Sequence, residues 1–145
     1  MQRPHDAASP MNARDIAGMF MRVAIAGGPQ VGKTTLAQAI RGQGHTLRST
    51  DDLIGGDWSK VSETVAGWFN RYGPWVVEGV AVPRALRKWL TARPGALAPC
   101  DLIIWLSTPH VELTPHQATM AKGVETVWRQ IQPELDARGV TILEM

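Results

Sequence analysis

The sequence predicts an α/β fold in which a five-stranded parallel sheet carries helices on both faces. From Arg22 onward, short apolar runs of strand length alternate with longer stretches whose apolar residues recur at helical spacing. The run Leu102 to Leu106 is apolar at every position, as expected of an interior strand that helices cover on each side. Strands that alternate with helices pair in parallel, so we expect one doubly wound sheet.

The first predicted elements flank a glycine-rich stretch. Residues 1–20 mix proline, asparagine and glycine with weak periodicity, which predicts an N-terminal tail or a short helix packed outside the core. Residues 21–145 form the domain itself. Within it, Val23 to Ala26 predict the first strand and Thr34 to Arg41 the first helix.

The middle of the chain repeats this alternation. His45 to Thr50 are expected to be extended and to lead into a polar turn. Apolar residues from Val61 to Phe69 recur with the helical period, and Trp75 to Val77 predict a buried strand. Pro83 suits the first turn of the next helix, because the N–H that proline lacks has no partner there.

The C-terminal third supplies the last helix and strand. A connector rich in proline and glycine, Ala92 to Pro99, leads into the apolar strand described above. Apolar residues from Val124 to Leu135 predict a helix with an irregularity at Pro133, and Val140 to Leu143 predict the closing strand.

Composition limits the class of protein. A chain of 145 residues has the length of one domain, and 44% hydrophobic residues are enough for a buried core. No apolar run reaches the roughly 18 residues that a membrane span needs, so we expect no membrane partner. The single cysteine, Cys100, forms no internal disulfide, and we therefore expect a cytoplasmic protein.

One motif carries chemistry. The stretch Gly27 to Thr34 matches the phosphate-loop pattern G-x-x-x-x-G-K-[ST] and stands between the first strand and the first helix, the context that the pattern requires. Its backbone N–H groups surround phosphates, Lys33 bridges the outer phosphates, and the Thr34 hydroxyl ligates Mg²⁺. We expect ATP and Mg²⁺ as cofactors, held by Gly27, Gly28, Pro29, Gln30, Val31, Gly32, Lys33, Thr34 and Thr35.

GTPases, motors and kinases share this motif, so other residues must discriminate among them. No Asn-Lys-x-Asp segment is present, which argues against a Ras-like GTPase. The phosphate loop, the acidic turn Thr50-Asp51-Asp52 and the strand end Trp75-Val76-Val77-Glu78-Gly79 make residues 22–145 resemble small P-loop kinases, of the polynucleotide-kinase-like or thymidylate-kinase-like superfamily. The resemblance implies a P-loop NTPase architecture of the nucleoside-kinase type.

The acidic turn is the candidate catalytic base. In kinases of the polynucleotide-kinase type an aspartate beyond the second strand accepts the proton of the acceptor hydroxyl, and Asp51 matches it, with Asp52 a close second. A carboxylate there also lies in the crevice where open α/β sheets bind ligands. The two aspartates could instead cap the following helix. The candidate catalytic residues are thus Lys33, Asp51 and Asp52.

Three further residues are candidates for the acceptor and metal side. The resemblance places Glu78 near Mg²⁺ or the acceptor, where it would act with Thr34, through water; alternatively, Glu78 pairs with Arg84. Arg84 and Arg87 begin the next helix and are expected to grip an acceptor phosphate. Together with Lys88 they could instead form a solvated basic face.

The resemblance also implies a basic lid over ATP after the fourth strand. The segment Thr108 to Lys122 occupies that place, but offers His110 and His116 where an arginine cluster is usual. Of the six tryptophans, four or more are expected in the core. Trp58 is the exception, because it follows Gly55-Gly56-Asp57 in a polar loop, where it either packs or stacks on a base.

Three functions remain open: a kinase acting on a hydroxyl, a nucleoside-monophosphate kinase, and a nucleotide-binding module without kinase activity. The acidic turn favours the first, because a phosphate acceptor is already ionised and needs no base. The short lid and the basic stretch after Glu78 resemble small viral P-loop kinases that phosphorylate 5-hydroxymethyluracil in DNA during thymidine hypermodification. This resemblance implies DNA as a partner and a phage protein acting in the host cytoplasm. A small-molecule, nucleotide or polynucleotide 5′-hydroxyl kinase is the alternative.

Overall fold

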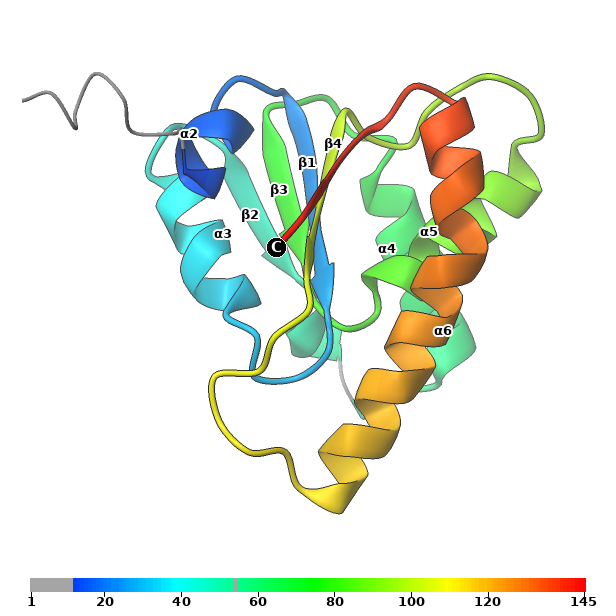
Figure 1. The fold of residues 1–145 in the computed structure, drawn as a ribbon. Helices are drawn as coiled ribbons and strands as arrows, with labels where there is room; N and C mark the ends of the chain where they lie inside the picture. The colour runs from blue at the N-terminus through cyan, green and yellow to red at the C-terminus, as the bar shows by residue number, and fades with distance from the viewer. Residues whose placement is uncertain (1–11, 54) are drawn as a thin grey trace, which may run out of the picture.

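The computed structural model of the chain describes residues 12–53 and 55–145 (Figure 1). The strands are β1 (Arg22–Gly27), β2 (Thr46–Ser49), β3 (Trp75–Glu78), β4 (Leu102–Leu106) and β5 (Thr141–Glu144). The helices are α2 (Ala13–Ala17), α3 (Lys33–Arg41), α4 (Trp58–Trp68), α5 (Val82–Ala92) and α6 (Pro115–Ala137), with a 3-10 turn η1 (Thr50–Leu53) after β2. The five strands form one sheet in the order β2-β3-β1-β4-β5, and every neighbouring pair is parallel.

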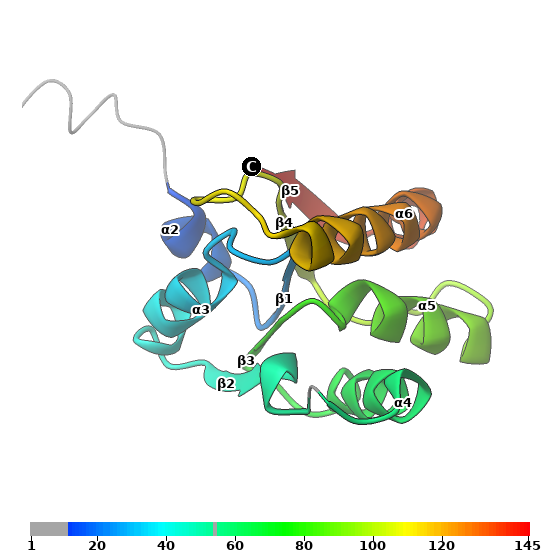
Figure 2. The ribbon, with the colours of Figure 1, turned by 90° about the horizontal axis from the view of Figure 1, so that it is seen from below.

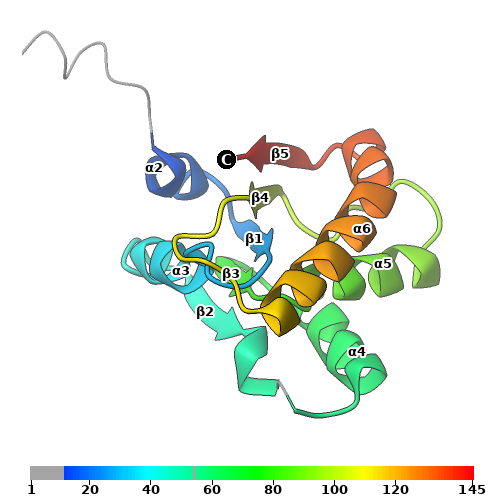
Figure 3. The ribbon, with the colours of Figure 1, turned by 60° about the horizontal axis from the view of Figure 1, so that its bottom comes forward.

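Helices cover both faces of this sheet, as the sequence predicts. Figure 2 and Figure 3 show α2 and α3 on one face and α4, α5 and α6 on the other. Alternation along β1 explains the two layers, because Val23 and Ile25 join the core beneath α3 while Ala24 and Ala26 join the core beneath α5. All four side chains are fully buried.

The apolar strand β4 lies between β1 and β5, which confirms its predicted interior position. Ile103 and Ile104 are fully buried in opposite cores, so helices cover both sides of the strand. On the α6 side, the Trp105 ring stacks on Trp128, with 5.2 Å between centroids. Trp75 and Trp89 are also buried, which confirms the expectation of at least four core tryptophans.

Two segments differ from expectation. Within residues 1–20, α2 does not pack outside the core: it buries Ala13 and Ala17 on the α3 face. Residues 1–11 lie outside the described residues.

The last helix is much longer than predicted. It begins at Pro115, well before Val124, and continues through Pro133. A capping box fixes its start, because the Thr114 side chain accepts a hydrogen bond from the Gln117 amide and the Gln117 side chain accepts one from the Thr114 amide. Along the described chain, no helix is both long and apolar enough to cross a membrane.

The strand order predicts a crevice at the carboxyl ends of the strands. After β1 the chain passes through α3 on one face, and after β3 it passes through α5 on the other face. The carboxyl ends of β1 and β3 therefore flank a topological switch point, the place where open α/β sheets bind ligands. Figure 3 shows this end of the sheet, with the loops after β1, β3 and β4 toward the viewer.

Candidate functional site

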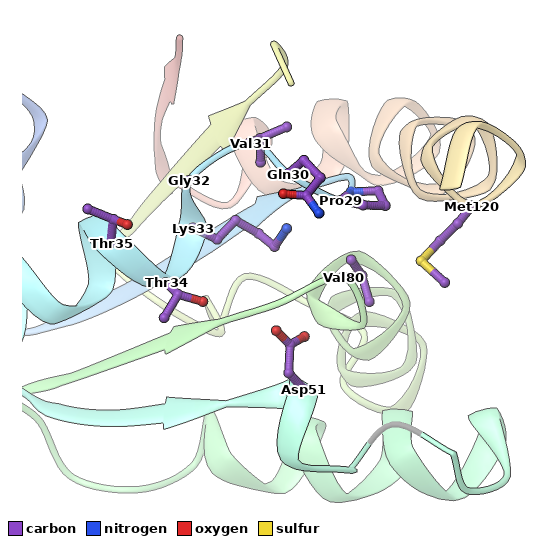
Figure 4. A pocket seen from close by; sticks show the side chains of 10 residues that line it. All are labelled: Pro29, Gln30, Val31, Gly32, Lys33, Thr34, Thr35, Asp51, Val80 and Met120. Carbon is purple, nitrogen blue, oxygen red and sulfur yellow. The ribbon is translucent and has the colours of Figure 1, made fainter. Parts of the chain in front are cut away.

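A cavity of about 560 Å³ opens at this switch point (Figure 4). Most of its wall comes from the loop after β1 and the first turn of α3, with single residues from η1, the turn after β3 and α6 facing them. The lining residues are Pro29, Gln30, Val31, Gly32, Lys33, Thr34, Thr35, Asp51, Val80 and Met120. The structure thus brings most of the glycine-rich loop and one of the two predicted catalytic aspartates to one hollow.

The glycine-rich loop (Gly27–Thr34) is held in a tight turn. Gln30 adopts a φ of 63° and Gly32 a φ of 91°, so the sign of φ alternates along the loop. Such alternation directs successive N–H groups into a concave nest that binds anions. A side chain at Gly32 would place its Cβ 2.7 Å from Nε2 of His110, whose own amide donates to the Gln30 carbonyl at 2.7 Å. The positive φ therefore favours glycine there, and a Cβ would in addition require the His110 ring to shift.

Lys33 begins α3 and its side chain turns back into the loop. It is only 6% exposed, and its Nζ donates to the Gly28 carbonyl. Burial lowers the pKa of this ammonium, while the carboxylates of Glu78 and Asp51 act in the opposite direction. A buried cation at a helix N-terminus, with one of its three N–H donors on a carbonyl, is well suited to a polyanionic ligand.

Glu78 stands at the carboxyl end of β3 and is 1% exposed. Its Oε1 accepts hydrogen bonds from Ser49 Oγ and from Thr34 Oγ1, the latter at 3.3 Å. Its Oε2 has no hydrogen-bond partner among the described residues. Burial raises the pKa of this carboxyl, and the bond from Ser49 opposes the shift. The alternative ion pair with Arg84 is not formed, so that interpretation is wrong.

The two aspartates of the acidic turn are separated by the structure. The Asp51 carboxylate projects into the cavity from η1 (Figure 4), whereas Asp52 does not line it. The turn is fixed on both sides, because the Asp51 amide donates to Ser49 Oγ at 3.2 Å and Thr50 Oγ1 accepts from the Ala81 amide. The alternative that the two aspartates cap the following helix is wrong, because neither is the N-cap residue of α4.

Asp57 takes the capping role instead. It is the N-cap residue of α4, and its side chain accepts a hydrogen bond from the Ser59 amide at 2.8 Å. The Asp51 carboxylate is therefore not used to cap α4 and can point into the cavity.

The donor set near Glu78 fits Mg²⁺. The Thr34 hydroxyl and the unpartnered Glu78 oxygen are hard oxygen ligands, of the kind that Mg²⁺ prefers. Within the described ranges no three His, Cys, Asp or Glu side chains gather as a metal cage. A magnesium ion here would complete its coordination with substrate phosphates and water, as Mg²⁺ commonly does.

The structure places Arg84 and Arg87 outside this cavity. Both line a separate groove between α4 and α5, together with Lys88 and Trp58. The Arg84 guanidinium lies 5.2 Å from the centroid of the Trp58 ring, and Arg87 donates to the Gln130 side chain at 3.0 Å. The sequence suggested that Trp58 lies in a polar loop, but this prediction is wrong, because Trp58 is the first residue of α4.

Three site residues were missed by sequence reasoning: Ser49, Val80 and Met120. Ser49 stands beside Glu78 only because β2 pairs with β3 in that register, which no local pattern reveals. Met120 enters the cavity because α6 starts early. The Thr114-Pro115-Gln117 pattern could have shown that start, since threonine, proline and glutamine at this spacing are typical of a helix N-terminus.

The segment predicted as a lid is divided in two. Residues 108–114 form a loop that touches the glycine-rich loop through His110, and residues 115–122 are the first turns of α6. Comparison with protein-family models and with curated proteins finds no match to the chain. The chemistry of the cavity is therefore what indicates function: a glycine-rich loop, a buried ammonium and one exposed carboxylate face one another there.

Proposed function

We propose that the chain is an ATP-dependent P-loop kinase that transfers the γ-phosphate of ATP to a hydroxyl group. The observation that supports this most directly is that Lys33 and Asp51 line one cavity at the switch point of the sheet. Lys33 provides a cation for phosphate, and Asp51 provides a carboxylate for a hydroxyl. The strand order and the position of the glycine-rich loop after β1 support a P-loop NTPase architecture of the nucleoside-kinase type.

The donor side is the glycine-rich loop with the N-terminus of α3. Backbone N–H groups and the helix dipole attract the phosphates, and Lys33 neutralises charge on the outer ones. Mg²⁺, when bound with ATP, would draw further charge from the phosphates, with Thr34 and Glu78 as its protein ligands, Glu78 through water. These interactions strengthen as charge moves onto the oxygens in the transition state, which is how they accelerate transfer.

The acceptor side is Asp51. Its carboxylate accepts the proton of the acceptor hydroxyl while the hydroxyl oxygen bonds to the γ-phosphorus. The bond between that phosphorus and the bridging oxygen of ATP breaks, and ADP leaves with the electron pair. Asp51 is exposed to solvent, so its carboxylate is accessible to the hydroxyl of an acceptor.

The first acceptor to test is the hydroxymethyl group of 5-hydroxymethyluracil in DNA, as the resemblance of the sequence implies. The resemblance also implies that the protein acts in the host cytoplasm. The experiment incubates the protein and labelled ATP with DNA containing 5-hydroxymethyluracil, with plain DNA that has 5′-hydroxyl ends, and with free nucleosides. Label in one class identifies the acceptor, with the Lys33→Ala protein as the blank. ATP binding without transfer to any acceptor would contradict the kinase and favour a nucleotide-binding module.

A further inference from the structure

A second hollow runs beside the cavity, between α4 and α5. Its volume is about 690 Å³, larger than the cavity itself. It is lined by Trp58, Ser59, Ser62, Arg84, Arg87, Lys88, Thr91 and Ala92. We call this the α4/α5 groove.

The α4/α5 groove is positively charged without compensation. Three of its lining residues are cations and none is acidic. Lys88 donates to the Ser59 carbonyl and hydroxyl at 2.9 and 2.8 Å, and Arg87 donates to an amide oxygen of Gln130, so both use neutral partners. In the described part of the chain no carboxylate forms a salt bridge with any of the three. Such a surface attracts anions.

The groove begins next to the cavity. Val80, in the turn before α5, lines the cavity, and Arg84, four residues further along the chain on α5, lines the groove. On α6, Met120 lines the cavity, while a Cβ at Gly123 would be 3.2 Å from the Arg84 guanidinium. The linings of the cavity and the groove therefore approach each other around the start of α5.

The shape of the charge favours a chain of phosphates over a single one. From Arg84 to Ala92 the groove follows α5 for eight residues, about 12 Å at 1.5 Å per residue. The three cations occupy residues 84 to 88, a rise of about 6 Å along the helix, and do not surround one point. Cations spread along one helix face are typical of surfaces that contact successive phosphates of a strand.

Trp58 adds a surface for a base. Its side chain is 40% exposed although an indole is usually buried, and the Arg84 guanidinium lies over its ring. Exposed aromatic rings beside cations are typical of proteins that bind nucleic-acid strands, because every base has a face that stacks. An acidic peptide would use the cations but not the ring.

We propose that the α4/α5 groove holds a nucleic-acid strand, with Arg84, Arg87 and Lys88 on its phosphates and Trp58 stacked on a base. The inference rests on the proposed function, because it assigns this strand as the carrier of the hydroxyl that reaches Asp51. Binding of the strand itself needs no ATP and no Lys33. The two proposals can therefore fail separately.

The test measures binding of a fluorescent twelve-nucleotide DNA strand by anisotropy, without ATP, at 50 and 200 mM salt. Arg87→Gln/Lys88→Gln should weaken binding and reduce its salt dependence, because fewer counterions are released. With a slope of about −0.7 per contact, the loss of affinity between the two salts should become about sevenfold smaller than in the wild type. The control Arg41→Gln/Lys60→Gln removes equal charge outside the groove and should keep the wild-type slope.

The ring is tested separately. Trp58→Ala should weaken binding at least about fivefold, and Trp58→Phe should restore most of it, because stacking on one base contributes about 1 kcal/mol or more. Equal salt slopes for the groove and control variants, or unchanged affinity in Trp58→Ala, would overturn the proposal. So would poly-glutamate that competes as well as DNA with no dependence on Trp58. If the strand binds but ATP does not, the kinase proposal fails and the proposal that the groove binds a nucleic-acid strand is kept.

Discussion

The Thr34 hydroxyl donates to Oε1 of Glu78 across 3.3 Å, which joins the first turn of α3 to the end of β3. Ser49, at the end of β2, donates to the same oxygen. One buried carboxylate thus connects the glycine-rich loop to the turn that carries Asp51. Its second oxygen has no partner among the described residues, so the connection leaves one ligand position open.

This buried carboxylate makes stability depend on pH. Burial raises the pKa of Glu78 in the folded state, so the native protein holds this proton to a higher pH than the unfolded chain does. Stability from this group is complete below the unfolded pKa near 4.5 and is lost as pH rises through the folded pKa. Glu78→Gln has no such loss. The variant should therefore gain stability relative to wild type as pH rises from 4 to 8.

Urea unfolding at pH 4, 6 and 8 measures the difference between the two proteins. It should grow by at most about 1.4 kcal/mol for each pH unit between the two pKa values. Glu63→Gln, an exposed glutamate on α4, controls for the removal of one carboxylate. A difference that stays constant with pH would show that the pKa of Glu78 is the same in the folded and unfolded states, and one that shrinks would show that folding lowers it; either result would contradict the prediction.

Lys33→Ala should abolish phosphoryl transfer and leave the fold intact. The ammonium acts on phosphate charge, and the removal of one such interaction raises the barrier by at least about 3 kcal/mol, more than a hundredfold in rate. Label transfer and far-UV circular dichroism measure the two effects, with the exposed Lys60→Ala as a control of equal charge. Near-normal turnover by folded Lys33→Ala protein would remove the kinase proposal.

Asp51→Asn should lower transfer about 10²- to 10⁴-fold, the usual contribution of a general base, and leave ATP affinity unchanged. Asp52→Asn is the matched control, because the adjacent aspartate lies outside the cavity and should change the rate little. Initial rates and isothermal titration with ATP separate the two parameters. A larger loss in Asp52→Asn than in Asp51→Asn would identify Asp52 as the inward carboxylate during turnover.

Most of the fold follows from patterns that are local in the sequence. The apolar run at residues 102–106 coincides with β4, and the glycine-rich loop lies between β1 and α3 as its motif requires. The early start of α6 was missed because apolar periodicity begins only near Val124. None of residues 115–122 is buried, and their helix is fixed by a cap and not by a buried face.

The site residues that are adjacent in the chain could be predicted from the sequence. The contacts that depend on strand register or helix packing could not. Lys33 and Thr34 are adjacent in the chain, so one motif locates both. The contact between Ser49 and Glu78 depends on how β2 and β3 align, and Arg84 turns to Trp58 because α4 packs against α5. Residues far apart in the chain create both contacts, which composition and periodicity do not encode.

The last prediction concerns the turn of the glycine-rich loop. Gly32→Ala should destabilise the fold, because an L-residue in the left-handed region costs about 1–2 kcal/mol and its Cβ would lie 2.7 Å from Nε2 of His110. The backbone part of this cost remains whatever surrounds it, whereas the contact with His110 disappears when that ring is removed. Gly32→Ala should therefore cost less in a His110→Ala background than in the wild type, but never less than the backbone part. Urea unfolding of the four proteins of this double-mutant cycle measures the interaction. Equal costs in both backgrounds would show that the His110 ring moves aside freely, and a cost near zero would show that the loop does not need glycine at this position.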